Sequence, residues 1–289
     1  MNAIPAPVEG DDVPAAPSPR VNRRRFLGFS LTVLAGVAGA AILDRLVPVY
    51  DDEVDAAAPL VPAYDAASKT WTFVVDTSRC IGCGLCVSAC KEENHVPDEP
   101  QYNRTWIERH AVSERGTVYV DAPGAGIDGF PPTSTAPGAD DAAIVSAYFV
   151  PRLCMQCEVS PCTTVCPVGA TYRTPEGVVL VDADRCIGCG YCITACPYGA
   201  RYIVPAAETT PQGVAGVADK CTWCYHRISK GRQPACVEVC PVGARRFGDL
   251  GDPADPIHEV LAADAVEVLH PEYGTRPRVL YVGPVTAEA

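Results

Sequence analysis

Cysteines at short, repeated spacings dominate the chemistry that this sequence can carry. The chain has 289 residues, and its sixteen cysteines fall into four runs of four. The third run, from Cys186 to Cys196, has the spacing C-x2-C-x2-C-x3-C-P, which is the bacterial ligand pattern for iron–sulfur clusters. Its first three thiols lie on one tight loop that can wrap one face of a cubane cluster. The fourth cysteine is expected to begin a helix and point elsewhere, so each cluster takes its fourth ligand from another run.

The same pattern recurs three more times along the chain. The first run, from Cys80 to Cys90, matches the third at eight of eleven positions, and the residues before each run are similar as well. The second run has the spacing C-x2-C-x4-C-x3-C-P and the fourth has C-x2-C-x11-C-x3-C-P. The second and fourth runs are Cys154, Cys157, Cys162 and Cys166, and Cys221, Cys224, Cys236 and Cys240.

Two other uses of cysteine explain the pattern less well. A disulfide framework is typical of short secreted chains and does not need C-x2-C-x2-C. Structural zinc uses paired C-x2-C knuckles, but it needs neither the third cysteine nor the proline that follows the fourth. Iron–sulfur ligation needs all of these features. His95 follows the first run, but a single histidine in a polar loop is more often a hydrogen-bonding residue, and the thiol ligands are complete without it.

Composition and charge narrow the class of protein. With 48% hydrophobic residues, the chain can build one or two domains with a real core. Its formal net charge of −12 disfavours a nucleic-acid partner, because such proteins carry a basic surface. No signature of a substrate site is present, and a fully coordinated cluster leaves no iron open for bond chemistry. We therefore expect no catalytic residues.

The N-terminal segment, residues 1–43, resembles a twin-arginine export signal. Arg23 and Arg24 precede a moderately apolar stretch, which is the order of a targeting segment. An ordinary secretion signal or an anchor with three arginines is the alternative. Export in the folded state favours the twin-arginine route, because clusters inserted in the cytoplasm do not survive unfolding. Residues 38–40 permit cleavage, whereas an uncleaved segment 26–43 is marginal for spanning a bilayer, so both outcomes stay open.

Local patterns between the runs predict a small set of strands and turns. Alternating or apolar stretches predict strands at 71–75, 117–120, 144–150, 171–173, 178–181, 201–204 and 278–282, and a helix at 256–264. Residues 121–141 are rich in Gly, Pro and Ser and predict a surface loop. The three C-terminal runs each end in Cys-Pro-x-Gly-Ala, which predicts a reversal from a short helix into the next strand.

In this order, the four runs resemble the iron–sulfur (beta) subunits of the dimethyl-sulfoxide-reductase superfamily of molybdoenzymes. The resemblance covers residues 70–283. It is carried by the cysteine runs and by four further strings: DKCTWC at 219–224, PACVEVCP at 234–241, FGDL at 247–250 and GTRPRV at 274–279. Together with the string VLHP at 268–271, these strings are most similar to members of the tetrathionate-reductase type.

The resemblance implies an α+β fold of two ferredoxin-like, two-cluster modules that are related by pseudo-duplication, with inserted loops and a C-terminal extension. The expected order is a signal or anchor at 1–43, a linker at 44–68, module 1 at 69–100 and 205–250, an inserted segment at 101–150, module 2 at 151–204 and a tail at 251–289.

The resemblance also implies four 4Fe-4S clusters with a defined ligand set for each. Some relatives replace one cysteine of the third run and hold a 3Fe-4S centre there, but Cys189 and its neighbours are intact. Cluster 1 takes Cys80, Cys83, Cys86 and Cys240; cluster 2 takes Cys90, Cys221, Cys224 and Cys236; cluster 3 takes Cys166, Cys186, Cys189 and Cys192; cluster 4 takes Cys154, Cys157, Cys162 and Cys196.

In function, the resemblance implies an electron-transfer subunit that is not itself an enzyme. It would relay electrons between an integral membrane quinone-interacting subunit and a molybdopterin-type catalytic subunit, on the periplasmic face of the cytoplasmic membrane. Membrane association would come through the partner and, if uncleaved, through the N-terminal segment. The alternatives are a freestanding soluble polyferredoxin and the iron–sulfur subunit of a periplasmic hydrogenase-type complex. Residues 101–153 and the tail after Cys240 disfavour a free carrier, which does not need such extra surface.

Side chains and glycines near the runs can tune cluster potentials. A positive charge beside a cluster favours its reduced, more negative state, although for any single residue a solvated surface charge is the more common outcome. The five candidate cations are Arg79, Arg185, Arg201, Lys220 and Arg245. Glycines in the first and third runs are expected to let backbone N–H groups approach cluster sulfurs; they are Gly82, Gly84, Gly188 and Gly190.

Overall fold

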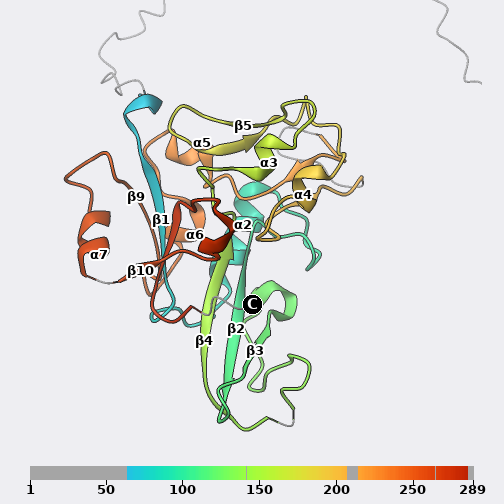
Figure 1. Ribbon diagram of the computed structural model, residues 1–289, viewed down its shortest axis with the longest axis vertical. Coiled ribbons are helices and arrows are strands. Elements are labelled where there is room, and N and C mark those ends of the chain that lie inside the picture. Colours follow the sequence, from blue (N-terminus) through green and yellow to red (C-terminus); the bar gives the residue numbers. More distant parts are fainter. Residues whose placement is uncertain (1–63, 141, 207–213, 264, 286–289) are drawn as a thin grey trace, which may run out of the picture. The chain divides into compact units, whose positions relative to one another are not determined.

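The computed structural model describes residues 64–140, 142–206, 214–263 and 265–285 (Figure 1). Short helices surround four small sheets in this part of the chain, so the predicted α+β class is confirmed. The predicted signal at 1–43 and most of the predicted linker at 44–68 lie outside the described residues. Among the helices that are described, none is long and apolar enough to cross a membrane.

The largest sheet has four strands in the order β10-β11-β1-β9. Its members are β10 (Val266–Glu267), β11 (Val279–Val282), β1 (Trp71–Asp76) and β9 (Arg245–Asp249). The central strand β1 pairs parallel with β11 and antiparallel with β9, and Phe73, Val74 and Val75 are fully buried. This burial on both faces explains the continuous apolar run that predicted the strand.

A second sheet has the order β3-β2-β4 and belongs to the inserted segment. Its strands are β2 (Thr105–Ser113), β3 (Val118–Asp121) and β4 (Ile144–Leu153). Strands β2 and β4 lie side by side over their whole length (Figure 1). The prediction of a surface loop at 121–141 is partly wrong. The segment contains the 3-10 helix η2 (Pro123–Gly126), and Ala125, Ala136 and Ala139 are buried.

The remaining strands form two hairpin-like pairs. Strand β5 (Thr171–Arg173) pairs antiparallel with β6 (Val179–Val181), where two strands were predicted, and β7 (Tyr202–Ile203) pairs with β8 (Ala218–Asp219). The other elements are η1 (Ala66–Ser68), α2 (Leu85–Asn94), α3 (Pro161–Thr164), α4 (Tyr191–Thr194), α5 (Tyr225–Ile228), α6 (Ala235–Glu238), α7 (Ile257–Ala263) and η3 (Pro271–Tyr273).

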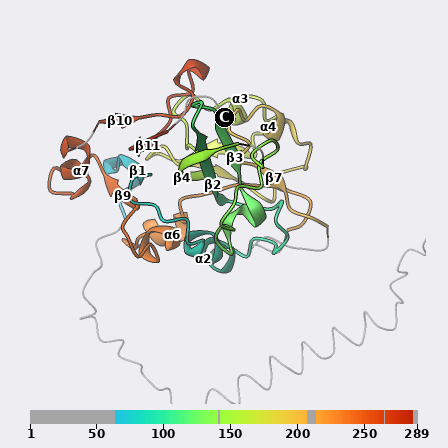
Figure 2. The ribbon, with the colours of Figure 1, turned by 90° about the horizontal axis from the view of Figure 1, so that it is seen from below.

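Strand and helix pairing joins the first run to the fourth, and the second to the third. Strand β1 precedes the first run and pairs with β9, which follows the fourth. Strand β5 follows the second run and pairs with β6, which precedes the third. Helices show the same relation, since α2 packs beside α6 and α3 beside α4 (Figures 1 and 2). Runs that are far apart in sequence thus lie next to each other.

The helix of each run begins before the third cysteine, so the expectation that the fourth cysteine starts a helix is wrong. Gly84 caps α2 with φ of 80°, and the helix starts at Leu85, which places Cys86 in its first turn. In the later runs the fourth cysteine follows the end of the helix. The predicted reversal after Cys-Pro-x-Gly-Ala is confirmed, because strands β5, β7 and β9 begin directly after it or one residue later.

Aromatic side chains fill the core between the sheets and the cysteine loops. Trp223 is fully buried, with its ring centroid 6.5 Å from that of Phe73 and 5.4 Å from that of Phe247. Buried cysteines from three runs belong to the same apolar cluster. The main core therefore holds these five thiols, which are Cys86, Cys154, Cys157, Cys221 and Cys236.

Replacing Gly84 with alanine should destabilise the fold more than the same change at Gly116. A Cβ at Gly84 would collide with the backbone carbonyls of Gly126 and Ile127 in the inserted segment. A positive φ alone costs a non-glycine residue about 1–3 kcal/mol. The matched control is Gly116→Ala, because Gly116 has a similar φ of 78° and nothing within 4 Å of the added Cβ. In thermal unfolding followed by circular dichroism, G84A should melt several degrees below G116A; equal melting temperatures would contradict the close packing.

Candidate metal centres

The thiols expected for cluster 1 line one cavity. Cys80, Cys83, Cys86 and Cys240 lie on its wall together with Ile107 and Pro151 of the inserted sheet. Helix α2 positions Cys86, which is buried, whereas Cys83 is exposed. Burial raises the pKa of the Cys80 thiol to about 11, and the nearby Cys86 and Cys240 act in the same direction.

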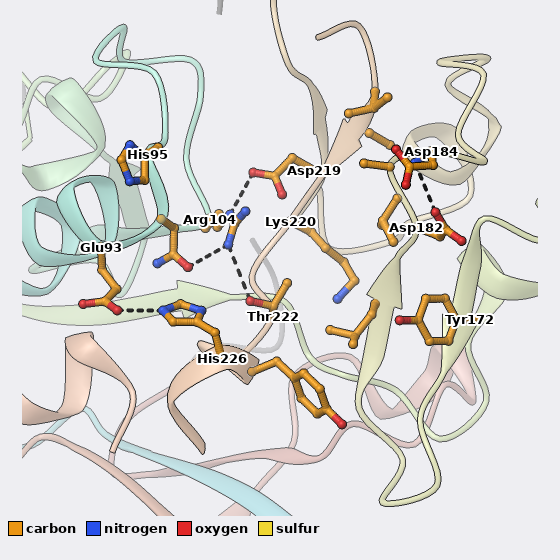
Figure 3. Close-up of a pocket in the computed structure, with 17 residues that line it drawn as sticks. Glu93, His95, Arg104, Tyr172, Asp182, Asp184, Asp219, Lys220, Thr222 and His226 are labelled. Atoms are coloured by element: carbon orange, nitrogen blue, oxygen red, sulfur yellow. Dashed lines mark hydrogen bonds and ion pairs between the residues drawn. The ribbon is translucent and has the colours of Figure 1, made fainter. Parts of the chain in front are cut away.

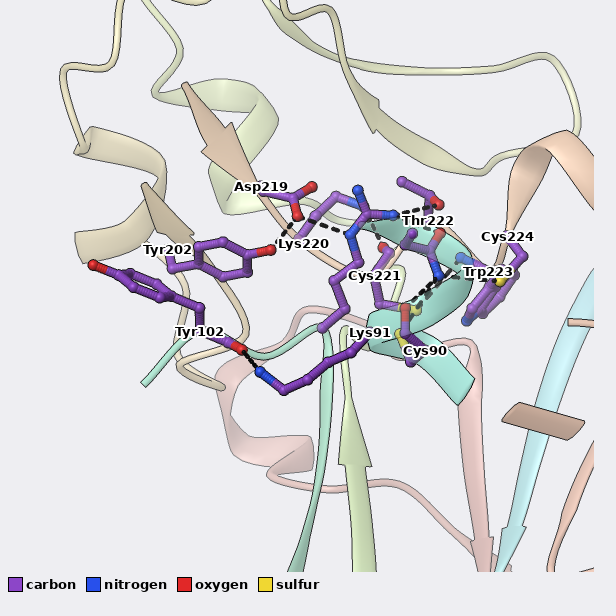
Figure 4. Close-up of polar contacts among 12 residues, drawn as sticks. Cys90, Lys91, Tyr102, Tyr202, Asp219, Lys220, Cys221, Thr222, Trp223 and Cys224 are labelled. Atoms are coloured by element: carbon purple, nitrogen blue, oxygen red, sulfur yellow. Dashed lines mark hydrogen bonds and ion pairs between the residues drawn. The ribbon is translucent and has the colours of Figure 1, made fainter. Parts of the chain in front are cut away.

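The thiols expected for cluster 2 are all buried. They come from α2, from the loop before α5 and from α6. Burial raises the pKa of Cys90 strongly, and the thiols of Cys221 and Cys236 add to the effect. Asn94 Nδ2 donates to Sγ of Cys90 at 3.6 Å and to Sγ of Cys224 at 3.7 Å. Figure 4 shows Cys90, Cys221 and Cys224 gathered around α2.

The thiols expected for cluster 4 are also close together. Burial raises the pKa of Cys157 to about 12, and the neighbouring Cys154, Cys162 and Cys196 add to it. Ser160 Oγ lies 3.2 Å from Sγ of Cys162, within a hydrogen bond. The second run supplies three of these thiols and the third run supplies Cys196.

The thiols expected for cluster 3 are the least buried. Cys189 is exposed, and Cys166 and Cys186 are partly exposed. Burial raises the pKa of Cys192, and the neighbouring thiol of Cys186 raises it further. Backbone N–H groups that donate to Cys166 lower its pKa, against the effect of its burial. Cys166 follows α3, which packs against the α4 helix that carries Cys192.

The donor sets fit iron–sulfur chemistry. Buried thiols that raise one another's pKa ionise together only when a metal cation balances their negative charge. Iron in these clusters is bound by thiolates. Thiol-only donors are the soft ligands that iron–sulfur clusters use. Within the residues that the structure describes, no three His, Cys, Asp or Glu side chains converge on one position that would hold a single metal ion.

Neighbouring sets follow one another in a definite order. Three pairs of thiols link neighbouring sets. In each pair, the thiol of one set adds to the effect of burial and raises the pKa of a thiol in the next set. For the expected ligand sets, these effects on pKa favour the order 1, 2, 4 and 3. The pairs are Cys86 with Cys236, Cys154 with Cys221, and Cys162 with Cys192.

A polar network beside the cluster 2 thiols was not predicted from the sequence. Arg104 Nε donates to Asp219 Oδ2 at 2.8 Å, and its Nη1 donates to Asn94 Oδ1 at 2.8 Å. Arg104 and Asp219 line a pocket between the end of α2 and strands β6 and β8 (Figure 3). Asn94 had a local signal, because it follows Cys90 by one helical turn. Arg104 and Asp219 are 115 positions apart in the sequence, so no local sequence pattern predicts that they pair.

Comparison with known protein families identifies both halves of the cysteine region. Residues 79–170 and residues 145–250 each match a family described as 4Fe-4S dicluster domain. Two dicluster domains and sixteen cysteines give four 4Fe-4S clusters.

Several curated proteins are similar over most of the chain. A tetrathionate reductase subunit of Salmonella typhimurium is 37% identical over 266 residues, which is 91% of this chain and 88% of that protein. The putative dimethyl sulfoxide reductase iron-sulfur subunit of Halobacterium salinarum is 38% identical, over 73% of this chain and 78% of that protein. The corresponding tetrathionate reductase subunit of Archaeoglobus fulgidus is 42% identical, over 73% and 81%. With its four clusters, the chain belongs to the iron–sulfur subunit family of the dimethyl-sulfoxide-reductase superfamily of molybdoenzymes.

Proposed function

We propose that this chain relays single electrons along four clusters, between an integral membrane quinone-interacting subunit and a molybdopterin-type catalytic subunit. The observation that carries the proposal is the succession of thiol sets between two exposed cysteines, Cys83 and Cys189. The sets between them are almost wholly buried. Such a succession suits a conductor with one contact at each end.

The ligand sets expected for clusters 1 to 4 are part of the proposal. Their support is the pairing of β1 with β9 and of β5 with β6, which brings the first run to the fourth and the second to the third. The shared cavity of the cluster 1 thiols and the mutual effect of thiols on pKa within the other sets agree with it. On the same grounds we propose that the two modules are pseudo-duplicates.

The residues of the chain have two tasks in such a relay. The clusters, once bound, supply one-electron redox chemistry over a range that the protein environment sets. Buried side chains and backbone N–H groups set that environment by hydrogen bonds, such as those from Asn94 to two thiols of the cluster 2 set. The surrounding core keeps solvent away from the inner sets.

Both ends of the succession carry exposed apolar side chains. Ile81 is 56% exposed and Leu85 is 44% exposed beside Cys83. Ile187 is 65% exposed and Tyr191 is 62% exposed beside Cys189. Large exposed apolar side chains around a functional group are typical of interaction surfaces. We place one partner at each end.

Relatives support the assignment to a complex. Their names describe single components of larger reductases: the tetrathionate reductase of Salmonella typhimurium, the polysulfide reductase of Wolinella succinogenes and the selenate reductase of Mesobacillus selenatarsenatis. A protein named as one component of a reductase implies further components. Neither a freestanding polyferredoxin nor a hydrogenase-type component is favoured by these names.

The proposed location is the periplasmic face of the cytoplasmic membrane, reached in the folded state by twin-arginine export. The support is the Arg23-Arg24 pair ahead of an apolar stretch. Replacing both arginines with lysine should abolish export and leave the protein in the cytoplasm with its clusters. Fractionation of cells, with a secreted control protein that uses the general pathway, measures this; normal export of the variant would contradict the route.

Replacing Cys196 with serine should alter cluster 4 and leave cluster 3 intact, although Cys196 belongs to the same run as Cys186. The matched variant is Cys166→Ser, which should alter cluster 3 and leave cluster 4. EPR spectra of the reduced protein distinguish the two, and iron content should stay within about one cluster of the sixteen irons that four cubanes contain. Loss of the Cys186 cluster alone in C196S would refute the ligand sets.

Placing a charge at each end should release one partner at a time. Ile81→Asp should lose one of the two partner subunits on purification from membranes, and Ile187→Asp should lose the other, because a buried charge weakens an apolar interface by several kcal/mol. EPR signals of the four clusters should remain. Purification of the unaltered chain as a stable monomer, without any partner, would exclude the proposed function.

A further inference from the structure

Of the five cationic side chains near the ligand runs, two are exposed to solvent and three are buried. Arg79 and Arg185 are exposed, as the sequence favours for a single charge. For the other three, the expectation of a solvated charge is wrong: Arg201 is 5% exposed, Arg245 is 2% exposed and Lys220 is fully buried. Each pair of neighbouring sets thus has one buried cation near its thiols. Arg245 lies near sets 1 and 2, Lys220 near sets 2 and 4, and Arg201 near sets 4 and 3.

Two of the three buried cations hold equivalent places in the repeat. Arg201 and Arg245 each come five residues after the fourth cysteine of a run, at the end of the same Cys-Pro-x-Gly-Ala string. Both guanidinium groups bind a threonine hydroxyl at the start of a strand. Arg245 Nη2 lies 2.8 Å from Thr105 Oγ1, and Arg201 Nη1 lies 3.4 Å from Thr171 Oγ1.

Arg245 lies beside the thiols of sets 1 and 2: it lines the cavity of the set 1 thiols, and the charge of the set 2 thiol Cys236 acts on it. Opposing its burial, the thiols of Cys86 and Cys236 raise the pKa of Arg245, and Cys86 and Cys236 belong to different sets. Its Nε and Nη1 atoms are buried and have no hydrogen-bond partner among the described residues. A buried guanidinium with two free donors and no carboxylate lacks its anion.

Arg201 lies between the thiols of sets 4 and 3. Its Nη2 donates to Sγ of Cys162 at 3.0 Å. Its charge also lowers the pKa of Cys192, against the burial that raises the pKa of that thiol. As with Arg245, the described part of the chain offers it no carboxylate.

Other buried arginines show the contrast. Arg104 pairs with Asp219 at 2.8 Å, and Arg109 pairs with Asp121 at 2.7 Å. Burying an unpaired charge is costly, and proteins normally pair it. At Arg201 and Arg245 the acidic groups that act most strongly on the guanidinium are cluster thiols, so the thiolate-bound cluster fits as the missing anion.

We propose that Arg245 and Arg201 are fixed counter-charges that raise the reduction potentials of the clusters on either side of each: clusters 1 and 2 for Arg245, and clusters 4 and 3 for Arg201. The inference rests on the ligand sets of the proposed function. It concerns positioning of charge, not contact with a substrate. Lys220 is left out of it, because an amine is neutralised by burial more readily than a guanidinium.

The physical reason is the charge that reduction adds. A cluster gains negative charge when it is reduced, and a fixed positive charge in a low-dielectric core favours that state. A charge placed between two clusters favours both, so it keeps their potentials level while it lowers the repulsion between neighbouring reduced centres. An exposed arginine is screened by water and ions and has little of this effect.

The test is a redox titration of the intact complex, followed by EPR. In Arg245→Gln, clusters 1 and 2 should lose about tenfold or more in their reduction equilibrium constants, which is about 59 mV for a one-electron couple. In Arg201→Gln, clusters 4 and 3 should shift in the same way. Arg245→Lys and Arg201→Lys, which keep the charge, should restore most of each shift. A merely structural role would not follow the charge.

Exposed arginines provide matched controls. Arg79 adjoins Cys80 and Arg185 adjoins Cys186, and both are exposed, so Arg79→Gln and Arg185→Gln should leave all four potentials close to those of the unaltered protein. An independent variant works in the opposite direction. Asp219→Asn leaves Arg104 buried without its carboxylate and close enough to affect Cys90, and it should raise the potential of cluster 2.

The outcomes separate the inference from the ligand sets. If R245Q shifts no more than R79Q, or if R245K shifts as much as R245Q, the inference is overturned while the ligand sets stand. Shifts of the expected size at other clusters would overturn the ligand sets instead. If the glutamine variants fail to assemble, D219N decides: an unchanged or lower potential of cluster 2 overturns the inference, and a rise supports it.

Discussion

Thiols from runs far apart in the sequence must be buried side by side, and most of the fold follows from this constraint. The first and fourth runs are separated by the second and third runs, yet β1 pairs with β9 and α2 packs beside α6. The sheets are small, and the shared apolar cluster contains cysteines as well as aromatic side chains such as Trp223. A core of this kind is completed by what its thiols bind, because metal binding to such sites is coupled to folding.

Burial of so many ionisable thiols makes charge balance the second constraint. The structure handles it in two ways. Arg104 is neutralised by Asp219, and Asn94 donates neutral hydrogen bonds to thiols of the same set. Among the described residues, Arg245 and Arg201 have no carboxylate partner; each binds one threonine hydroxyl, and their charges act on the cluster thiols. The difference matters because a paired arginine contributes a dipole, whereas an unpaired one contributes a full charge whose field reaches neighbouring centres.

The sequence specified the local parts and not their environment. The four runs, the strand at Trp71 and the β5–β6 hairpin were predictable, because their signals lie within a few residues. The helix starts were misplaced because the positive φ of a glycine such as Gly84 opens the helix one residue after it. Burial of charges was also missed. Arg79 adjoins Cys80 and is exposed, while Arg245 adjoins no cysteine and is buried, since strand pairing decides which side chain faces the core.

Because of the inserted segment, the surroundings of the two ends of the cluster chain, at Cys83 and at Cys189, differ. Ile107 and Pro151 line the cavity of the cluster 1 thiols, and the carbonyls of Gly126 and Ile127 leave no room for a side chain at Gly84. At the equivalent Gly190 in the third run, an added Cβ would meet no described residue within 4 Å. One end is therefore built partly from strands β2 and β4 and their loop, whereas at the other end the segment around Gly216 packs on Gly188 and Cys186. Repeated modules alone would offer two similar ends, and an insertion into one of them gives each end its own surface for a different partner.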